Sequence, residues 1–170
     1  MKTEQMMKIK IRKTIWLIVL VVIIWGAKDI SAQKKIDLEK EKTELLKTHQ
    51  IDKKAHFETD VKLLLEGQLE DFIAVSNGKI ERPTLADRKQ MFTTYFKDAK
   101  YYEWDDLEPP IISVSKDATM GWIITRIKVR RTQKQSSGAE REVSFVYAGI
   151  MTYEKQKGKW VKIANVSTFQ

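Results

Sequence analysis

The stretch 141–170 constrains the fold of this chain most, because it has the pattern of two long paired strands. Two runs rich in Val, Ile, Tyr, Phe, Thr and Trp, Val143–Tyr153 and Trp160–Phe169, flank the charged turn Glu154–Lys159. These residue types pack well on a pleated surface, and Gly158 provides the backbone freedom that a tight turn needs. The stretch therefore predicts a β-hairpin at the centre of a curved sheet.

The earlier part of the chain predicts helices before most of the strands. Apolar residues at Phe57, Val61, Leu64 and Leu65 share one face of a helix, which we expect to end at Gly67. The other predicted elements are strands at 71–76, 79–81, 101–107, 111–115 and 120–130, and a helix over 85–98. Asn77-Gly78 predicts a tight turn between the first two strands. Thr84 and Asp87 resemble a capping box at the start of the helix, and Met91, Tyr95 and Phe96 are expected along one side of it. Helices that are segregated from a run of antiparallel strands indicate the α+β class.

Composition excludes several classes of protein. The 170 residues are 42% hydrophobic and 32% charged, which is typical of one globular domain. The formal charge is +8, but residues 1–32 hold six basic and two acidic residues, so 25 basic and 21 acidic residues remain, a net +4. Because these charges are interspersed, we expect no nucleic-acid partner. The chain has no cysteine, which excludes a disulfide framework and thiol catalysis.

The N-terminus has the pattern of a secretory signal peptide, which we assign to residues 1–32. Four basic residues between 8 and 13 precede the apolar run Ile15–Trp25, small residues at 26–27 end the run, and the small residues Ser31 and Ala32 follow. A membrane-spanning helix needs roughly 20 apolar residues, and this run is shorter. Cleavage after Ala32 would leave an exported domain, periplasmic or extracellular. The alternative is an uncleaved membrane anchor, which the Trp residues at both ends of the run favour.

Three stretches carry a family resemblance: AHFETDVKLLLEGQLEDFIAVSNGKI, YFKDAKYYEWDDLEPPIISVSKDATMGW and VYAGIMTYEKQKGKWVKIANVSTF. They resemble the nuclear transport factor 2-like superfamily, in particular its SnoaL-like branch of small bacterial domains. The resemblance implies a domain over 51–170, and the residues rich in Lys and Glu before it predict a charged helical lead-in over 33–50. It implies a cone-shaped α+β fold, also described as cystatin-like, with N-terminal helices packed on a strongly curved antiparallel sheet. A pocket inside the cone and homodimers through the outer face of the sheet are further implications.

His56 and Asp60 are the candidates for catalysis. They are four residues apart on the predicted helix and therefore neighbours on its surface, where a carboxylate can orient an imidazole for proton transfer. The alternative is a surface pair without a chemical role. Steroid isomerases of the superfamily use an Asp base with a Tyr and a protonated Asp as donors, and we cannot match that trio here.

Candidates for ligand binding are the aromatic residues Tyr95, Trp104, Trp122 and Tyr147, and Asn165 on the last strand. Pockets for small molecules are mostly apolar with a few polar anchors, and Asn165 would be such an anchor on an apolar strand face. The alternative is that the aromatic residues fill an ordinary core and that the end of the last strand is exposed to water.

The sequence favours an exported domain that binds a small, mostly apolar molecule or acts as an interaction module. One alternative is an enzyme of the isomerase, cyclase or dehydratase type, with Asp60 or His56 as general base and Tyr95 or Tyr147 as hydrogen-bond donor. Another is a structural homodimer. We expect no cofactor and no metal, and contact with a membrane only through an uncleaved N-terminal segment.

Overall fold

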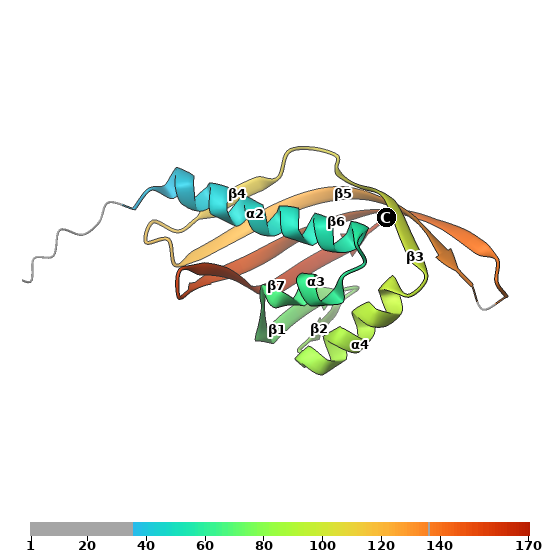
Figure 1. Ribbon diagram of the computed structural model, residues 1–170. Helices are drawn as coiled ribbons and strands as arrows, with labels where there is room; N and C mark the ends of the chain where they lie inside the picture. Colours follow the sequence, from blue (N-terminus) through green and yellow to red (C-terminus); the bar gives the residue numbers. More distant parts are fainter. Residues whose placement is uncertain (1–35, 136) are drawn as a thin grey trace, which may run out of the picture. The chain divides into compact units, whose positions relative to one another are not determined.

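The computed structural model describes residues 36–135 and 137–170, which form helices packed on a curved sheet (Figure 1). The helices are α2 (Leu38–Phe57), α3 (Val61–Glu66) and α4 (Leu85–Phe96). The strands are β1 (Gln68–Ser76), β2 (Lys79–Glu81), β3 (Ala99–Asp106), β4 (Ile111–Val114), β5 (Met120–Lys134), β6 (Glu140–Gln156) and β7 (Lys159–Phe169). The predicted signal peptide, residues 1–32, lies outside the described residues. Among those that are described, no helix is long and apolar enough to cross a membrane.

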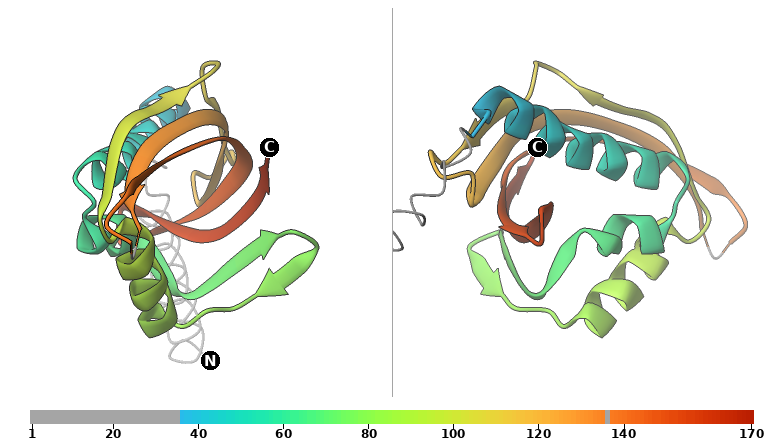
Figure 2. Two further views of the ribbon diagram at one scale, coloured as in Figure 1. Left: turned by 90° about the vertical axis from the view of Figure 1, so that its right-hand side faces the viewer. Right: turned by 60° about the vertical axis from the view of Figure 1, so that its left-hand side comes forward.

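The sheet has the strand order β2-β1-β7-β6-β5-β3, and β4 also pairs with β5. β5, β6 and β7 curl strongly, and α2 lies across one face of the curl (Figure 2). The α+β class and the curved sheet are confirmed, with one correction. All pairs are antiparallel except β1 with β7, which run parallel. Parallel strands require a long connection, and here the chain from β2 to β6 lies between them.

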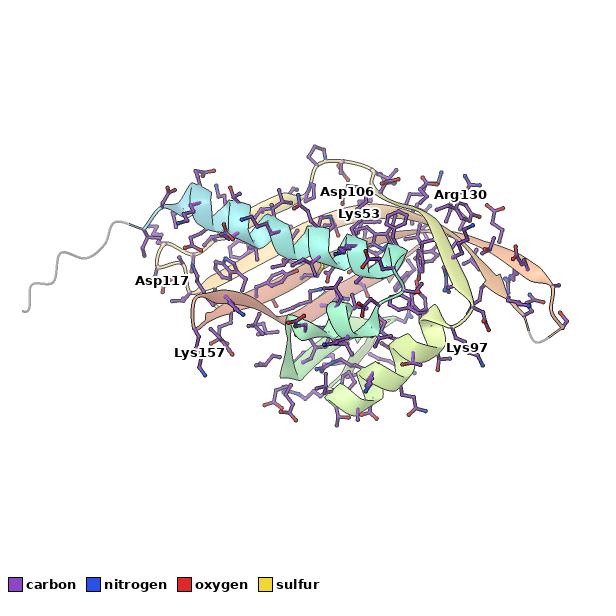
Figure 3. The ribbon with its side chains drawn as sticks, viewed as in Figure 1. Lys53, Lys97, Asp106, Asp117, Arg130 and Lys157 are labelled. Carbon is purple, nitrogen blue, oxygen red and sulfur yellow. The ribbon has the colours of Figure 1, made fainter. Side chains whose placement is uncertain are left out.

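Both hairpins predicted from turn residues are confirmed. Asn77 and Gly78 have φ angles of 50° and 75°, and Lys157 and Gly158 have φ angles of 48° and 81°. Two successive residues with positive φ form the turn whose twist matches that of antiparallel strands. The second turn lies at the same end of the sheet as Asp117 in the connection from β4 to β5 (Figure 3).

The prediction of one continuous helix through Leu65 is wrong. α2 ends at Phe57, Thr59 has a φ of 50°, and α3 begins at Val61. Asp60 is the N-cap of α3, and its carboxylate accepts a hydrogen bond from the backbone N–H of Leu63 at 2.9 Å. A short side chain that bonds nearby backbone groups favours a helix start over a helix interior, which explains the break.

The helix α4 begins with the capping box that Thr84 and Asp87 predicted. Its buried residue Arg88 is 1% exposed and donates to the carbonyl oxygens of Leu69, Glu70 and Pro83 at 2.7–3.1 Å. The pairing of β1 with β7 is interrupted between Gln68 and Ile73, so two of these carbonyls have no partner strand. Arg88 therefore replaces missing sheet hydrogen bonds and ties α4 to β1. Met91, predicted to lie on the same side as Tyr95 and Phe96, is 53% exposed.

The core consists of two apolar clusters beneath α2. Ala55, Leu64, Phe96, Tyr101, Trp104, Ile127 and Val129 form the first, and Leu45, Ile123, Met151, Tyr153 and Trp160 form the second. At the second cluster α2 approaches the sheet closely: a Cβ at Gly121 would lie 2.7 Å from Leu45 Cδ2. Leu45 and His49 are buried, so the segment expected as a charged lead-in contributes to the core.

Candidate functional site

Polar side chains on α2 separate the two apolar clusters. His49, Asp52 and His56 are spaced by three and four residues and therefore lie on one face of the helix, toward the sheet. His49 is 3% exposed and Asp52 is 8% exposed. With their partners on β3, β6 and β7 they form a layer of polar groups inside the domain, which we call the polar layer.

The centre of the polar layer is a buried ion pair between Asp52 and Lys162. Lys162 Nζ donates to Asp52 Oδ2, and the lysine is 7% exposed. Burial is the largest single effect and lowers the pKa of Lys162, but the charge and the hydrogen bond of Asp52, together with Tyr153 and Tyr147, outweigh burial and raise the pKa above its usual range. Lys162 therefore carries its charge at neutral pH.

A β-bulge turns Lys162 toward the interior. In the pairing of β6 with β7, Thr152 faces Ala164 and Tyr153 faces Lys162, so Ile163 is an extra residue. Simple alternation would have grouped Asn165 with Ile163 and placed Lys162 on the opposite face. Because of the bulge, Lys162 and Asn165 lie on the same face of the sheet. Simple alternation would have placed them on opposite faces.

His56 is held as a neutral imidazole with one free lone pair. Its Nδ1–H donates to the carbonyl oxygen of Asp52 at 2.7 Å, which leaves the lone pair on Nε2. The ring packs against Trp104 at 5.0 Å and meets the edges of Phe96 and Tyr101. Burial lowers the pKa of His56, against the opposing effect of Asp52. His56 can therefore act through Nε2 as a hydrogen-bond acceptor or a weak base.

His49 has the opposite arrangement one turn before Asp52. Its Nε2 lies 3.0 Å and 2.9 Å from the two carboxylate oxygens of Asp106 and donates to them. Asp106 is at the end of β3, at the side of α2 that also presents Lys53 (Figure 3). Lys53 pairs with the neighbouring Asp105 at 2.6 Å. These contacts attach α2 to β3 and fix the position of the polar layer along α2.

On the sheet side, Tyr147 lies across Gly149 and reaches Asn165. The Tyr147 hydroxyl donates to Asn165 Oδ1 at 2.8 Å. A Cβ on Gly149 would overlap the same hydroxyl, so only glycine permits this position of the ring. Tyr147 and Asn165 are both partly exposed, which makes this side of the layer reachable from solvent. Burial raises the pKa of Tyr147, so its hydroxyl stays protonated.

The structure brings some predicted site residues together and separates others. Trp104, Tyr147 and Asn165 line the polar layer with His56. Tyr95 lies at the end of α4 beneath the guanidinium of Arg131, at 4.1 Å. Three predictions need correction. Asp60 is a helix cap and makes no hydrogen bond or ion pair with His56 among the described residues. Trp122 faces outward and is 37% exposed, and the single helix that paired His56 with Asp60 is broken.

Sequence reasoning missed Asp52, Lys162 and His49. Spacing was an available signal, because Leu45, His49, Asp52 and Ala55 follow one helical face. The two polar members resembled solvated charges in a segment rich in Lys and Glu. Among the described residues, no three His, Cys, Asp or Glu side chains are grouped as a metal site requires.

Comparisons with known proteins show what this architecture is similar to. No protein-family model and no curated protein matches the sequence. An NTF2-like protein with a cystatin-like fold from Novosphingobium aromaticivorans has 14% identity and a TM-score of 0.55, over 75% of this chain and 80% of that chain. A ketosteroid isomerase-like protein from Erwinia carotovora atroseptica has 11% identity and a TM-score of 0.58, over 76% and 95%. An NTF2-like protein of unknown function in nutrient uptake from Rhodospirillum rubrum has 12% identity and a TM-score of 0.56, over 74% and 98%.

The buried ion pair yields a first prediction. Asp52→Leu or Lys162→Met alone should lower the free energy of unfolding by about 3–5 kcal/mol, because each leaves an uncompensated buried group. The double variant Asp52→Leu with Lys162→Met should recover most of this loss. Urea unfolding measures all three, and Glu41→Gln is a control on the more exposed pair of Glu41 with Lys155. Additive losses in the double variant would contradict the pairing.

His56 yields a second prediction, on pH. Its folded pKa lies below the ordinary value of 6.5, so between the two values the unfolded chain binds more protons. The free energy of unfolding should therefore fall as pH drops below about 6.5, by at most about 1.4 kcal/mol per pH unit for one proton. His56→Gln should flatten this dependence in urea unfolding at several pH values. An unchanged slope in that variant would show that His56 is not the titrating group.

Proposed function

We propose that this chain, which has the nuclear transport factor 2-like fold that its sequence predicted, binds a small, mostly apolar molecule inside that fold. The observation that carries the proposal is the buried pair of Asp52 with Lys162. A buried ion pair is weak evidence for stability, because apolar residues of similar volume usually serve a core as well. The pair lies between two apolar clusters. This arrangement resembles a binding site for a small molecule, which has apolar walls and a few polar groups that fix the orientation of the ligand.

The walls of the proposed site are aromatic. Trp104 and His56 stack on one side, and Tyr147 lies on the sheet opposite. His56, Tyr147 and Asn165 are partly exposed, so a molecule would enter on their side and reach Lys162 behind them. Flat rings provide large contact area at small entropic cost, which suits a flat or elongated apolar ligand.

The test is native mass spectrometry of the protein purified from its own host, followed by a thermal-shift screen of small molecules. We expect a co-purified molecule, or stabilisation by at least one compound, because a ligand that binds only the folded state raises its melting temperature. Tyr147→Ala should weaken this effect, and Trp122→Ala, on the outer face, should not. A protein with no bound molecule and no stabilising compound would contradict the proposal.

A second candidate function is proton transfer, favoured by the lone pair on His56 Nε2. A neutral imidazole held by its other nitrogen is a suitable general base. The Tyr147 hydroxyl, which donates to Asn165 in this structure, is the candidate hydrogen-bond donor. One structural neighbour is named as ketosteroid isomerase-like. His56 takes the role that we assigned to either His56 or Asp60.

This enzyme candidate has its own test. With a ligand in hand, the protein should catalyse exchange of an acidic C–H of that ligand with deuterated water. His56→Gln should lower the exchange rate by about 10²–10⁴-fold while the ligand still binds, as for the loss of a general base. Equal exchange rates with and without the protein would exclude the enzyme and leave binding intact.

A third candidate function, a homodimer through the outer face, has a specific observation behind it. Residues that pair in register form an aliphatic row across six strands: Ile80, Val75, Val166, Ile150, Ile124 and Ile111. Of these, Ile80, Ile111 and Val166 are 75%, 60% and 42% exposed. A groove of about 390 Å³ is lined by four residues of the row and by Glu108 and Arg126. A second copy, turned about a twofold axis, would cover this row with its own and pair these opposite charges.

Val166→Lys should therefore convert a dimer to a monomer, because it places a charge in the centre of the row. Ile51→Lys is a matched control, since Ile51 on α2 is 44% exposed but lies away from the outer face. Light scattering after size exclusion measures the mass of each. If the unaltered protein is a monomer at working concentration, no homodimer forms.

The proposed place of action is outside the cytoplasmic membrane, either periplasmic or extracellular, with an N-terminal membrane anchor as the alternative. The basic head and the apolar run Ile15–Trp25 support this proposal. Cell fractionation with N-terminal sequencing tests it: a mature protein that begins near Gln33 is expected. A full-length product in the cytoplasm would contradict both forms.

A further inference from the structure

The buried polar atoms that have no hydrogen-bond partner among the described residues are mostly donors. Eight side-chain atoms belong to this group. Six of them carry a proton to donate, namely Arg88 Nε, Tyr101 Oη, Thr125 Oγ1, Arg131 Nε, Tyr153 Oη and Trp160 Nε1. Gln68 Oε1 is an acceptor, and so is His49 Nδ1 in the neutral ring, because His49 Nε2 donates to Asp106. Buried donors usually have partners. Tyr153 and Trp160 belong to the second apolar cluster, so that part of the interior is matched by a molecule that brings acceptor oxygens.

The charges of the interior have the same bias. Among the described residues, the buried charged side chains are Asp52 and the three cations Arg88, Arg131 and Lys162. Arg88 is committed to the three carbonyl oxygens below α4. Arg131 donates to the Tyr95 carbonyl oxygen at 2.7 Å and has no carboxylate partner among the described ion pairs. Among the described residues, Lys162 and Arg131 are thus two buried cations against one buried carboxylate, Asp52, and this excess of positive charge favours an anion.

Lys162 has donors to spare. An ammonium group has three N–H donors, and the hydrogen bond to Asp52 uses one of them. The Lys162 ammonium also lies 5.9 Å from the centre of the Tyr153 ring, whose hydroxyl is one of the buried donors without a partner. One acceptor group with two oxygens would satisfy both side chains at once.

We propose that the molecule bound in the polar layer is an apolar carboxylic acid, with its carboxylate on Lys162 and Tyr153. This inference rests on the proposed binding function and specifies its ligand class. The apolar part of the acid lies toward Tyr147 and Asn165, where the layer is open to solvent. A carboxylate matches both the donor excess and the charge excess, whereas an alcohol matches only the first and an amine matches neither.

The test compares octanoate, decanoate and dodecanoate with octanol, decanol and dodecanol by isothermal titration calorimetry. For at least one chain length the acid should bind about tenfold more tightly than the alcohol, as expected for one charge-assisted hydrogen bond. Lys162→Met should abolish this difference and retain binding of the alcohol. Asp52→Asn should strengthen binding of the acid, because it removes the carboxylate that competes for Lys162. A merely structural ion pair would give losses in both variants.

Lys155→Met is the matched control, because Lys155 lies on the same hairpin and pairs with Glu41 on α2. It should leave the preference for the acid unchanged. If Lys162→Met does not fold, Asp52→Leu with Lys162→Met replaces it, and circular dichroism confirms folding of each variant.

Three further outcomes separate the ligand class from the binding function. Alcohols that bind as tightly as the acids would overturn the carboxylate and leave the binding function standing. Absence of binding by both series, together with a co-purified molecule that has no acid group, would overturn the carboxylate in the same way. Absence of any ligand would overturn both the carboxylate and the binding function.

Discussion

The buried ion pair between Asp52 and Lys162 joins the first described helix to the last strand. It lies between two apolar clusters, each of which packs α2 against the sheet. Apolar contacts are not directional, whereas a buried charge must meet its partner, so this pair sets where α2 lies along the sheet. The contact of His49 with Asp106 fixes the position of α2 relative to β3 in the same way. The geometry of His56 follows, because it bonds the backbone of Asp52.

The inner and outer faces of the central strands have separate tasks. On β5 to β7 the inward side chains hold the polar layer and the apolar clusters, and the outward ones include most of the aliphatic row. Because successive residues of a strand point to opposite faces, one short stretch of sequence serves both. Asn165 belongs to the proposed ligand site, and Val166 beside it belongs to the proposed interface. Ligand binding and self-association are therefore separable by substitution.

The predictions that succeeded rest on local chemistry. Asn77-Gly78 fixes a hairpin, and Thr84 with Asp87 starts a helix, because turns and caps depend on a few adjacent residues. The candidate site was predicted only in part. The sequence identified Trp104, Tyr147, Asn165 and His56 as candidates, but it did not show which residues they contact. Lys162 was missed because a bulge at Ile163 changes the alternation on which the face assignment depended. Asp60 was misplaced because a helix break and a helix interior have similar apolar spacing.

The position of Lys162 in the chain has a consequence for folding. Its partner Asp52 lies 110 residues earlier. The parallel pairing of β1 with β7 also joins distant parts of the chain and cannot form before β7 is present. Contacts between distant parts of a chain form late, because a large loop must close first. Until the last strand has been synthesised, Asp52 has no counter-charge and the polar layer cannot be buried at low cost. Closure of the polar layer is therefore expected to be among the last steps of folding.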